Sequence, residues 1–323
     1  MNETTNHCCR ICGNGTNNRA FHVREMMFGW KDGFEYFECA DCGCVQIAAI
    51  PDDLDKYYPT DYYAFGKPRH TGTPSVSWWR KLRNRALLGQ QVPTARAIKA
   101  LSRAPGYFSW FRGLNLDLDS RILDVGCGAG SLLLRMRKAG FTRLMGLDPY
   151  IEEDIDYGGG LVIRKTEIAS LTERFDLVMS HHSFEHMPDP RSSLATLAGL
   201  LQPNGALLVR IPVTGGYAAR KYRNHWVNLD PPRHLHLHTT RSMAVLAAAC
   251  GLRIERVFFD SDAQQIIGSE LFRLDIPLRE ASRVTKSMFS AEELAAINLF
   301  VKELNARRDG DCAGFVMRPI QQS

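Results

Sequence analysis

The chain of 323 residues is long enough for one large hydrophobic core and a small additional domain. Its 45% hydrophobic and 23% charged residues are typical of a soluble globular protein, and no apolar run approaches the roughly 18 residues needed to cross a bilayer. The net charge of +5 and the isoelectric point near 8.7 permit an anionic substrate such as a nucleotide-sugar or RNA, without requiring one.

The first residues, Met1–His7, are polar and lack the apolar core of a secretion signal. We therefore expect a cytoplasmic protein without membrane insertion. Six of the nine cysteines fall within Cys8–Cys44. In a cytoplasmic chain such clustering favours metal binding over disulfides.

Two Cys-x-x-Cys-Gly motifs lie in this N-terminal segment. A gap of two residues lets both thiolates of a motif face one tetrahedral ion, and the following glycine relieves the turn. Between the motifs, residues 21–28 and 34–38 predict two strands around a turn at 31–33. This layout predicts a zinc ribbon with four ligands: Cys9, Cys12, Cys39 and Cys42.

Two further cysteines, Cys8 and Cys44, leave the ligand set open, since either could replace a predicted ligand. Four thiolates leave no open coordination position, so the expected Zn2+ is structural. A domain of about 45 residues cannot bury enough apolar surface to fold unaided, so the ion is expected to stabilise it.

A connector follows over residues 51–113. It begins with tyrosines that either line a substrate pocket or pack the ribbon onto the main domain, and a loop is expected over Pro68–Pro74. A helical pattern covers residues 76–103, and its basic residues fit a solvated helix face better than a nucleic-acid patch. The tyrosines are Tyr57, Tyr58, Tyr62 and Tyr63, and the basic residues are Arg80, Lys81, Arg83 and Arg85.

From Leu118 onward, apolar strand patterns alternate with helical ones, which predicts a mostly parallel sheet covered on both faces. The predicted strands are residues 121–126, 144–148, 161–166, 175–180, 206–211 and 252–259, with a last apolar run at 314–317. The predicted helices are residues 130–139, 189–201, 240–250 and 290–307.

The most informative stretch is Leu123–Gly130, where a strand enters a turn with glycines at alternate positions and a helix follows at once. Eighteen residues past Gly130, a second strand ends in Asp148, about where such a unit places a carboxylate for ribose hydroxyls. The glycine spacing is one residue tighter than the Gly-x-Gly-x-x-Gly turn that cradles a pyrophosphate. A nucleoside ligand without phosphate fits this turn better.

Four motifs in order resemble the class I S-adenosylmethionine-dependent methyltransferases over residues 118–323. Leu123–Gly130 resembles their first motif and Gly146–Pro149 their second. The third, Phe175–Ser180 with Phe184–Pro190, resembles the fourth-strand motif, and Leu200–Val209 resembles the entry to strand five. The resemblance implies a doubly wound, mostly parallel, seven-stranded Rossmann-like α/β sheet that binds S-adenosylmethionine.

Carried over residue by residue, the resemblance implies three groups of cofactor contacts. Asp148, with Pro149, would bind the ribose, Glu167 and Ile168 would lie near the adenine, and His181 and His182 would lie by the methionine part and the reacting centre. The turn residues bordering the cofactor would be Asp124, Gly126, Cys127, Gly128 and Gly130. The segment Ile151–Gly160 is acidic and glycine-rich, so the helix that the family usually has there is expected to be missing.

Methyl transfer from a sulfonium needs alignment and, for a hydroxyl or acidic carbon, removal of a proton, which suggests histidine as general base. Candidates are His181, His182 and a cluster between strand five and the next helix. In that cluster we favour His234, because Pro231–Leu235 resembles a segment of methyltransferases from polysaccharide and secondary-metabolite pathways. The cluster contains His225, His234, His236 and His238.

The alternation of His234, His236 and His238 also fits a strand edge with three imidazoles on one face, or a second metal site. The basic and aromatic run Tyr217–Trp226 fits a phosphate or carboxylate site, or a mobile lid.

The sequence thus predicts a methyltransferase acting on a small, anionic or glycan-like acceptor such as a sugar or nucleotide-sugar. The alternatives are an RNA methyltransferase that docks RNA through the zinc ribbon, and a partner-binding protein with an inactive methyltransferase domain. Dispersed basic residues and an acidic ribbon argue against RNA. The predicted domains are residues 1–50 (ribbon), 51–113 (connector and cap) and 114–323 (methyltransferase).

Overall fold

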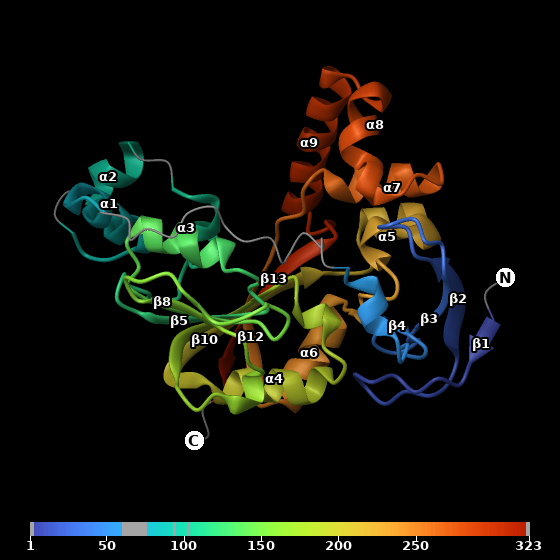
Figure 1. Ribbon diagram of the computed structural model, residues 1–323, viewed down its shortest axis with the longest axis horizontal. Helices are drawn as coiled ribbons and strands as arrows, with labels where there is room; N and C mark the ends of the chain where they lie inside the picture. The colour runs from blue at the N-terminus through green and yellow to red at the C-terminus, as the bar shows by residue number, and fades with distance from the viewer. Residues whose placement is uncertain (1–2, 60–75, 93–94, 102–103, 321–323) are drawn as a thin grey trace. The chain divides into compact units, whose positions relative to one another are not determined.

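The computed structural model describes residues 3–59, 76–92, 95–101 and 104–320 (Figure 1). The predictions for Tyr62, Tyr63 and the loop Pro68–Pro74 lie outside these residues. The chain forms two compact units, each assembled from three segments. The first unit comprises Met1–Pro59, Phe184–Leu194 and Arg210–Phe315, and the second comprises Thr60–Ser183, Ala195–Val209 and Val316–Ser323.

The larger sheet confirms the predicted mostly parallel architecture. Its strand order is β12-β13-β10-β9-β5-β6-β8-β7, and the pairs β5–β6, β5–β9 and β6–β8 are parallel. It has eight described strands where seven were predicted, because the short β7 pairs antiparallel with β8. The strands are β5 (Arg121–Val125), β6 (Arg143–Leu147), β7 (Ile155–Asp156), β8 (Leu161–Arg164), β9 (Phe175–His181), β10 (Leu201–Pro212), β12 (Leu252–Phe259) and β13 (Cys312–Pro319).

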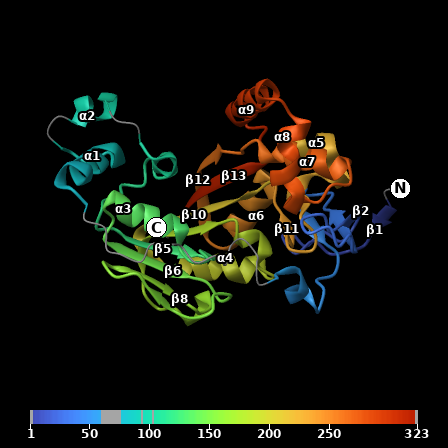
Figure 2. The same cartoon turned by 45° about the horizontal axis from the view of Figure 1, so that its top comes forward.

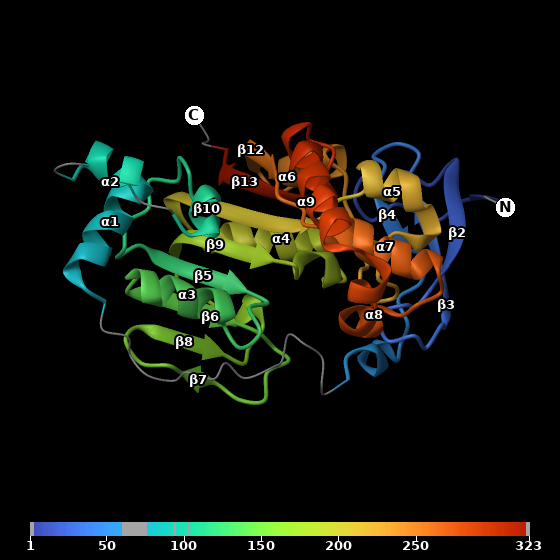
Figure 3. The same ribbon diagram turned by 90° about the horizontal axis from the view of Figure 1, so that it is seen from above.

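Strands β5 and β9 are buried along nearly their whole length, as expected for parallel strands covered on both faces. In the second unit, α3 (Ser131–Ala139) lies along β5 and β6 (Figure 3). The helical pattern predicted for residues 76–103 forms two helices, α1 (Trp78–Leu88) and α2 (Ala95–Leu101). These helices pack against each other (Figure 2). Helix α4 (Pro190–Gly199) matches the prediction for residues 189–201.

The segment between β6 and β8 contains β7 and turns, and among its described residues there is no helix. Gly158, Gly159 and Gly160 all adopt positive φ, which forms a turn and is incompatible with a right-handed α-helix. The expectation that the second helix is missing is therefore confirmed.

The first unit contains a five-stranded sheet in the order β1-β2-β3-β4-β11, of which Figure 1 labels β1 to β4. The predicted hairpin is present, but its first strand ends at Arg24 instead of residue 28. The reason is that the Glu25 carboxylate accepts hydrogen bonds from the backbone of Phe28 and Trp30, 2.8 and 2.9 Å away, and turns the chain. The strands are β1 (Glu3–Thr5), β2 (Asn18–Arg24), β3 (Gly33–Glu38), β4 (Val45–Ile47) and β11 (His236–Leu237).

Two helices of the first unit begin with a side-chain cap. The Thr239 and Ser290 side chains accept hydrogen bonds from the backbone of the residue three positions on, at the starts of α6 and α9. Across the described residues, none of the helices combines the length and the apolar character needed to span a bilayer. The helices are α5 (Tyr217–Tyr222), α6 (Thr240–Ala249), α7 (Gln264–Arg273), α8 (Ala281–Met288) and α9 (Ala291–Ala306); α5, α7 and α8 were not predicted.

Candidate active site

The glycine turn of the second unit leaves its backbone bare. Gly126, Gly128 and Gly130 have φ angles of 71°, 53° and 77°, which residues with a Cβ rarely adopt. A Cβ on Gly126 would lie 2.3 Å from the Ser183 Cβ, so no side chain fits there. The Ser183 hydroxyl donates to the Val125 carbonyl over 2.8 Å and so joins the end of β9 to the end of β5. The turn is therefore shaped for a ligand that lies against the main chain.

Asp148, which follows β6, is tied to the same turn. Its Oδ2 accepts the Gly128 N–H at 2.8 Å, and its Oδ1 accepts the Tyr150 N–H at 2.9 Å. The carboxyl is buried, and burial raises its pKa. A nucleoside with two ribose hydroxyls offers donors that match this acceptor, and the bare turn beside it needs no phosphate. The residues present therefore fit S-adenosylmethionine.

Asp124, the acid within β5, is also buried. Desolvation, followed by the negative charge of Asp148, raises the pKa of Asp124 to about 8. Its Oδ1 is buried, and no hydrogen-bond partner for it is found among the described residues. Two carboxyls in one buried site favour a cationic ligand, and S-adenosylmethionine carries a sulfonium and an ammonium group.

Two residues that the sequence analysis did not identify, Tyr157 and Arg137, stabilise the glycine turn through hydrogen bonds. The Tyr157 hydroxyl donates to the Ala129 carbonyl over 2.9 Å. The buried Arg137 in turn donates to the carbonyls of Tyr157 and Gly158 at 2.5 and 2.7 Å. The only signal in the sequence is that Arg137 lies in a helix rich in apolar residues, where a buried charged side chain is unusual.

His181 ends β9, and its ring lies 4.9 Å from the Trp110 ring. His182 follows with a φ of 51°, the left-handed region that is uncommon for residues other than glycine. Both histidines belong to the second unit together with the glycine turn. Glu167, predicted to lie near the adenine, follows β8 and precedes a short 3-10 turn at Ile168–Ser170.

A second group of titratable side chains gathers in the first unit. Glu185 and His186 lie in a 3-10 turn at Phe184–His186, and His234 lies before β11. One potential ligand atom from each lies within 4.8 Å of the other two, so the group could hold either an acceptor or a metal ion. The rings of His186 and His234 are 4.9 Å apart, and the Tyr58 hydroxyl lies 3.2 Å from His186 Nδ1.

The hydrogen bonds of these histidines determine which nitrogen can accept a proton. His234 Nδ1 lies 2.7 Å from the Asn228 carbonyl, and His186 Nδ1 lies 2.8 Å from the Arg233 carbonyl. A carbonyl only accepts, so both Nδ1 atoms must carry hydrogen and each Nε2 keeps a lone pair when the ring is neutral. His234 Nε2 lies 4.0 Å from Glu185 Oε1 and 3.8 Å from Asp230 Oδ2.

A buried ion-pair network, consisting of Glu25, Asp230 and Arg233, supports His234. Arg233 is fully buried and donates to Asp230 Oδ1 at 2.5 Å and to Glu25 Oε1 at 2.9 Å. Its guanidinium also lies over the Phe28 ring, 5.4 Å from the ring centre. Since Glu25 belongs to the predicted ribbon, the ribbon contacts the segment that carries His234.

Two backbone links join the same parts. The Tyr36 hydroxyl in β3 donates to the His234 carbonyl over 2.8 Å, and β11 pairs antiparallel with β4 through His236 and Gln46. Two of the four tyrosines lie in the described part of the chain. Tyr57 packs against the Trp30 and Phe34 rings, and the Tyr58 hydroxyl contacts His186.

The other histidines of the segment differ in environment. His236 and His238 are buried, and desolvation lowers the pKa of both, to about 4 for His238. Both rings are therefore neutral near pH 7 and belong to the packed interior. No metal-ligand group among the described residues includes them, and His225 is exposed.

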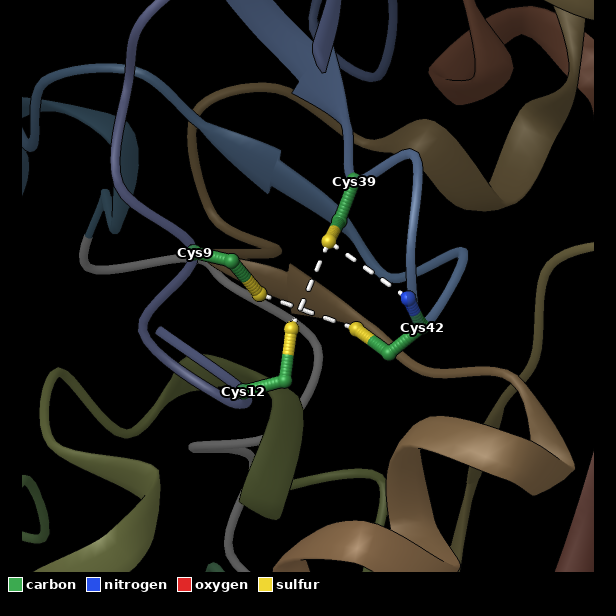
Figure 4. Close-up of side chains that lie close together, drawn as sticks. All are labelled: Cys9, Cys12, Cys39 and Cys42. Carbon is green, nitrogen blue, oxygen red and sulfur yellow. Dashed lines mark hydrogen bonds between the residues drawn. The ribbon is translucent and has the colours of Figure 1, made fainter. Parts of the chain in front are cut away.

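The four predicted zinc ligands come together in the ribbon (Figure 4). The Sγ atoms of Cys9 and Cys42 are 3.6 Å apart, and those of Cys12 and Cys39 are 3.5 Å apart. A tetrahedral zinc with Zn–S bonds of about 2.3 Å requires sulfurs about 3.8 Å apart, so the group fits this ion. Cys8 is exposed and Cys44 is buried, and neither belongs to the four.

We expect the Cys39→Ser variant to lose bound zinc and most of its soluble yield, because three thiolates cannot complete the tetrahedral site that ties the two Cys-x-x-Cys-Gly turns together. Elemental analysis should find about one zinc per chain in the unmodified protein and well below half of that in the variant. Cys8→Ser is the matched control, since Cys8 lies outside the group of four, and it should keep its zinc. Folded protein purified without any metal would contradict the assignment.

Comparisons with known proteins agree with this geometry. Residues 80–257, more than half of the chain, match the sequence profile of a family described as a methyltransferase domain. The chain belongs to this methyltransferase family. Its fold is the Rossmann-like fold of class I S-adenosylmethionine-dependent methyltransferases, with a mostly parallel central sheet.

Relatives of this methyltransferase-family chain differ in what they act on. It is 30% identical over 135 residues to the tRNA U34 carboxymethyltransferase of Methylococcus capsulatus, covering 35% of this chain and 41% of that protein. It is 25% identical over 211 residues to the ubiquinone biosynthesis O-methyltransferase of Rhodopseudomonas palustris, covering 55% and 79%. Several of these curated relatives are matched over only about two fifths of their length, 41% and 43% for example.

Among solved structures, the chain is similar to an S-adenosylmethionine-dependent methyltransferase from Mesorhizobium loti. The sequence identity is 16% and the TM-score is 0.40, and the match covers 67% of this chain and 98% of that one.

Proposed function

We propose that this protein is an S-adenosylmethionine-dependent methyltransferase whose acceptor is a small, anionic or glycan-like molecule such as a sugar or nucleotide-sugar. The observation that carries the proposal is the bare glycine turn tied to Asp148 by the Gly128 N–H, within the part of the chain that matches the methyltransferase family. Asp124, Cys127, Pro149, Glu167 and His181 complete the proposed cofactor contacts.

When bound, the cofactor supplies a methyl group on a sulfonium that is already activated for displacement. The protein then has to hold the acceptor in line and remove its proton. We assign proton removal to His234 Nε2, whose lone pair is left free by the Nδ1 contact to the Asn228 carbonyl and which lies near the carboxylates of Glu185 and Asp230. His181 and His182 remain proposed neighbours of the reacting centre.

We further propose a role for each of the three predicted domains. Residues 1–50 would form a zinc ribbon, residues 51–113 a connector and cap, and residues 114–323 the methyltransferase domain. The Cys9, Cys12, Cys39 and Cys42 group supports a structural Zn2+. The ribbon's contacts to Arg233 and His234 support a role in shaping the acceptor site rather than in docking a separate partner.

The experiment is a screen for methyl transfer from isotope-labelled S-adenosylmethionine to a panel of nucleotide-sugars, free sugars and phenols, with transfer RNA as a separate arm. The proposal expects label in a small acceptor. Label only in RNA would favour the second candidate, an RNA methyltransferase, which the tRNA-modifying relative brings into consideration. Failure to bind the cofactor at all would favour an inactive, partner-binding protein.

We expect His234→Ala to lower turnover of the acceptor found in the screen by about a hundredfold or more, the usual contribution of a general base, without changing cofactor affinity. His225→Ala is the matched control, since His225 is an exposed histidine outside the cluster of Glu185, His186 and His234. Turnover should be measured as initial rates at saturating cofactor. A His234→Ala variant with full turnover would rule the residue out as base.

A further inference from the structure

Two adjacent tryptophans at the start of α1 are exposed to solvent. Trp78 and Trp79 are 62% and 63% exposed, and their rings stack on each other with centres 3.8 Å apart. Tryptophan is large and is highly buried on average, so an exposed pair is unusual on a surface that meets only water.

The chain around this pair is strongly basic. From Val76 to Leu116 there are eight lysines or arginines and no aspartate or glutamate, whereas the rest of the chain has slightly fewer basic than acidic residues. Within the described part of this region, only Arg85 reaches a carboxylate, that of Asp119 at 3.9 Å. Elsewhere, many exposed arginines do form ion pairs, as Arg19 does with Glu38 and Arg24 with Asp275. The positive charge around α1 is therefore available to an outside partner.

The helix is also attached to its neighbours α3 and α2. The buried Asn84 donates through Nδ2 to the Ala139 carbonyl at the end of α3, over 2.6 Å, and α1 packs against α2. Trp78, Trp79 and Arg80 are exposed in this position, so they do not serve the internal packing of the second unit.

We propose that the exposed start of α1, together with the exposed Arg96 of α2, docks on a bilayer surface that contains anionic lipid. Tryptophan is preferred at the level of lipid headgroups, because its ring has an apolar body and one N–H donor. Lysine and arginine beside it are attracted to anionic headgroups and can lay their apolar stems along the surface. An RNA surface would instead use separate aromatic rings for successive bases, whereas here the two indole rings stack on each other and one face of each is covered.

The test is sedimentation of the full-length protein with two kinds of vesicle. One contains phosphatidylcholine alone, and the other also contains about a third phosphatidylglycerol. Each basic residue near such an anionic surface contributes about 1 kcal/mol, or roughly fivefold in binding. We expect binding to the anionic vesicles, with a blue shift of tryptophan fluorescence, and little binding to the neutral ones. Arg80→Glu with Arg96→Glu should weaken binding by more than about tenfold, and so should Trp78→Ser with Trp79→Ser.

The matched control for charge is Arg283→Glu with Lys302→Glu, which changes the net charge equally at exposed positions of α8 and α9 and should bind as the unmodified protein does. All variants alter exposed side chains, and unchanged circular dichroism and melting temperature confirm that they fold. Equal binding to both vesicle types, or equal loss in the control, would overturn the proposal. Salt-sensitive binding of transfer RNA that the α1 variants lose, with no vesicle binding, would overturn it in favour of a nucleic-acid surface.

Discussion

Replacing Asp148 by alanine is expected to weaken S-adenosylmethionine binding by about a hundredfold or more, because hydrogen bonds to a charged acceptor contribute about 1.5–3 kcal/mol each. The carboxylate has two tasks. It would accept the ribose hydroxyls of the cofactor, and it already accepts the Gly128 N–H over 2.8 Å. The alanine variant leaves that buried N–H without its partner and loosens the turn. The affinity is measured by titration calorimetry.

Two further variants make this result specific. Asp148→Asn keeps an acceptor for Gly128 but removes the charge, so its affinity should lie between those of the unmodified protein and the alanine variant. Glu153→Ala removes an exposed acid five residues further on and should leave the affinity unchanged. Asp148→Ala with affinity within threefold of the unmodified protein would exclude Asp148 as the ribose ligand.

Replacing Arg233 by methionine is expected to lower the free energy of unfolding by about 3–5 kcal/mol, the loss typical when one partner of a buried ion pair is removed. The variant leaves the carboxylates of Glu25 and Asp230 buried without their shared cation. Arg241→Met is the matched control, because Arg241 pairs with Asp41 on the surface. Exposed pairs contribute at most about 1 kcal/mol. Urea unfolding at constant zinc measures both variants.

The pH dependence distinguishes this network from simple loss of packing. Burial by itself would raise the pKa of Asp230. The Arg233 guanidinium lowers this pKa by more than burial raises it, so the net shift is downward. In the unmodified protein this carboxyl therefore adds stability above its unfolded pKa of about 3.9. Without Arg233 burial dominates, the folded pKa rises, and stability falls as pH increases from about 4. The difference between the two proteins should be larger at pH 7 than at pH 4.5, and an equal difference at both would indicate a packing effect alone.

The parts of the fold that the sequence predicts are those determined by neighbouring residues. The β5–turn–α3–β6 unit follows from an apolar run, three glycines and a helical pattern within thirty residues, and the structure agrees with its predicted bounds to within one residue. The Cys-x-x-Cys-Gly motifs work the same way, because both thiolates of each pair are already positioned by a short turn.

The features that the sequence does not predict depend on contacts between residues far apart in the chain. Glu25 and Arg233 are 208 positions apart, and β11 has only two residues, too few for any strand pattern. Glu185 and His186 were noted only as part of a family motif, because their approach to His234 depends on how the chain returns after β10. The end of β2 at Arg24 was missed because a single side chain, Glu25, turns the backbone there.

The pairing of β4 with β11 also has a consequence for biosynthesis. Strand β4 is made well before β11, so the edge of β4 that pairs with β11 stays unpaired until His236 and Leu237 have been made. An unpaired strand edge readily joins other chains, and long-range pairing slows folding. Zinc bound early by the four cysteines would keep the nascent ribbon compact during this interval. A cell producing this protein without sufficient zinc should therefore accumulate aggregates of newly made chains, while protein that has already matured stays intact.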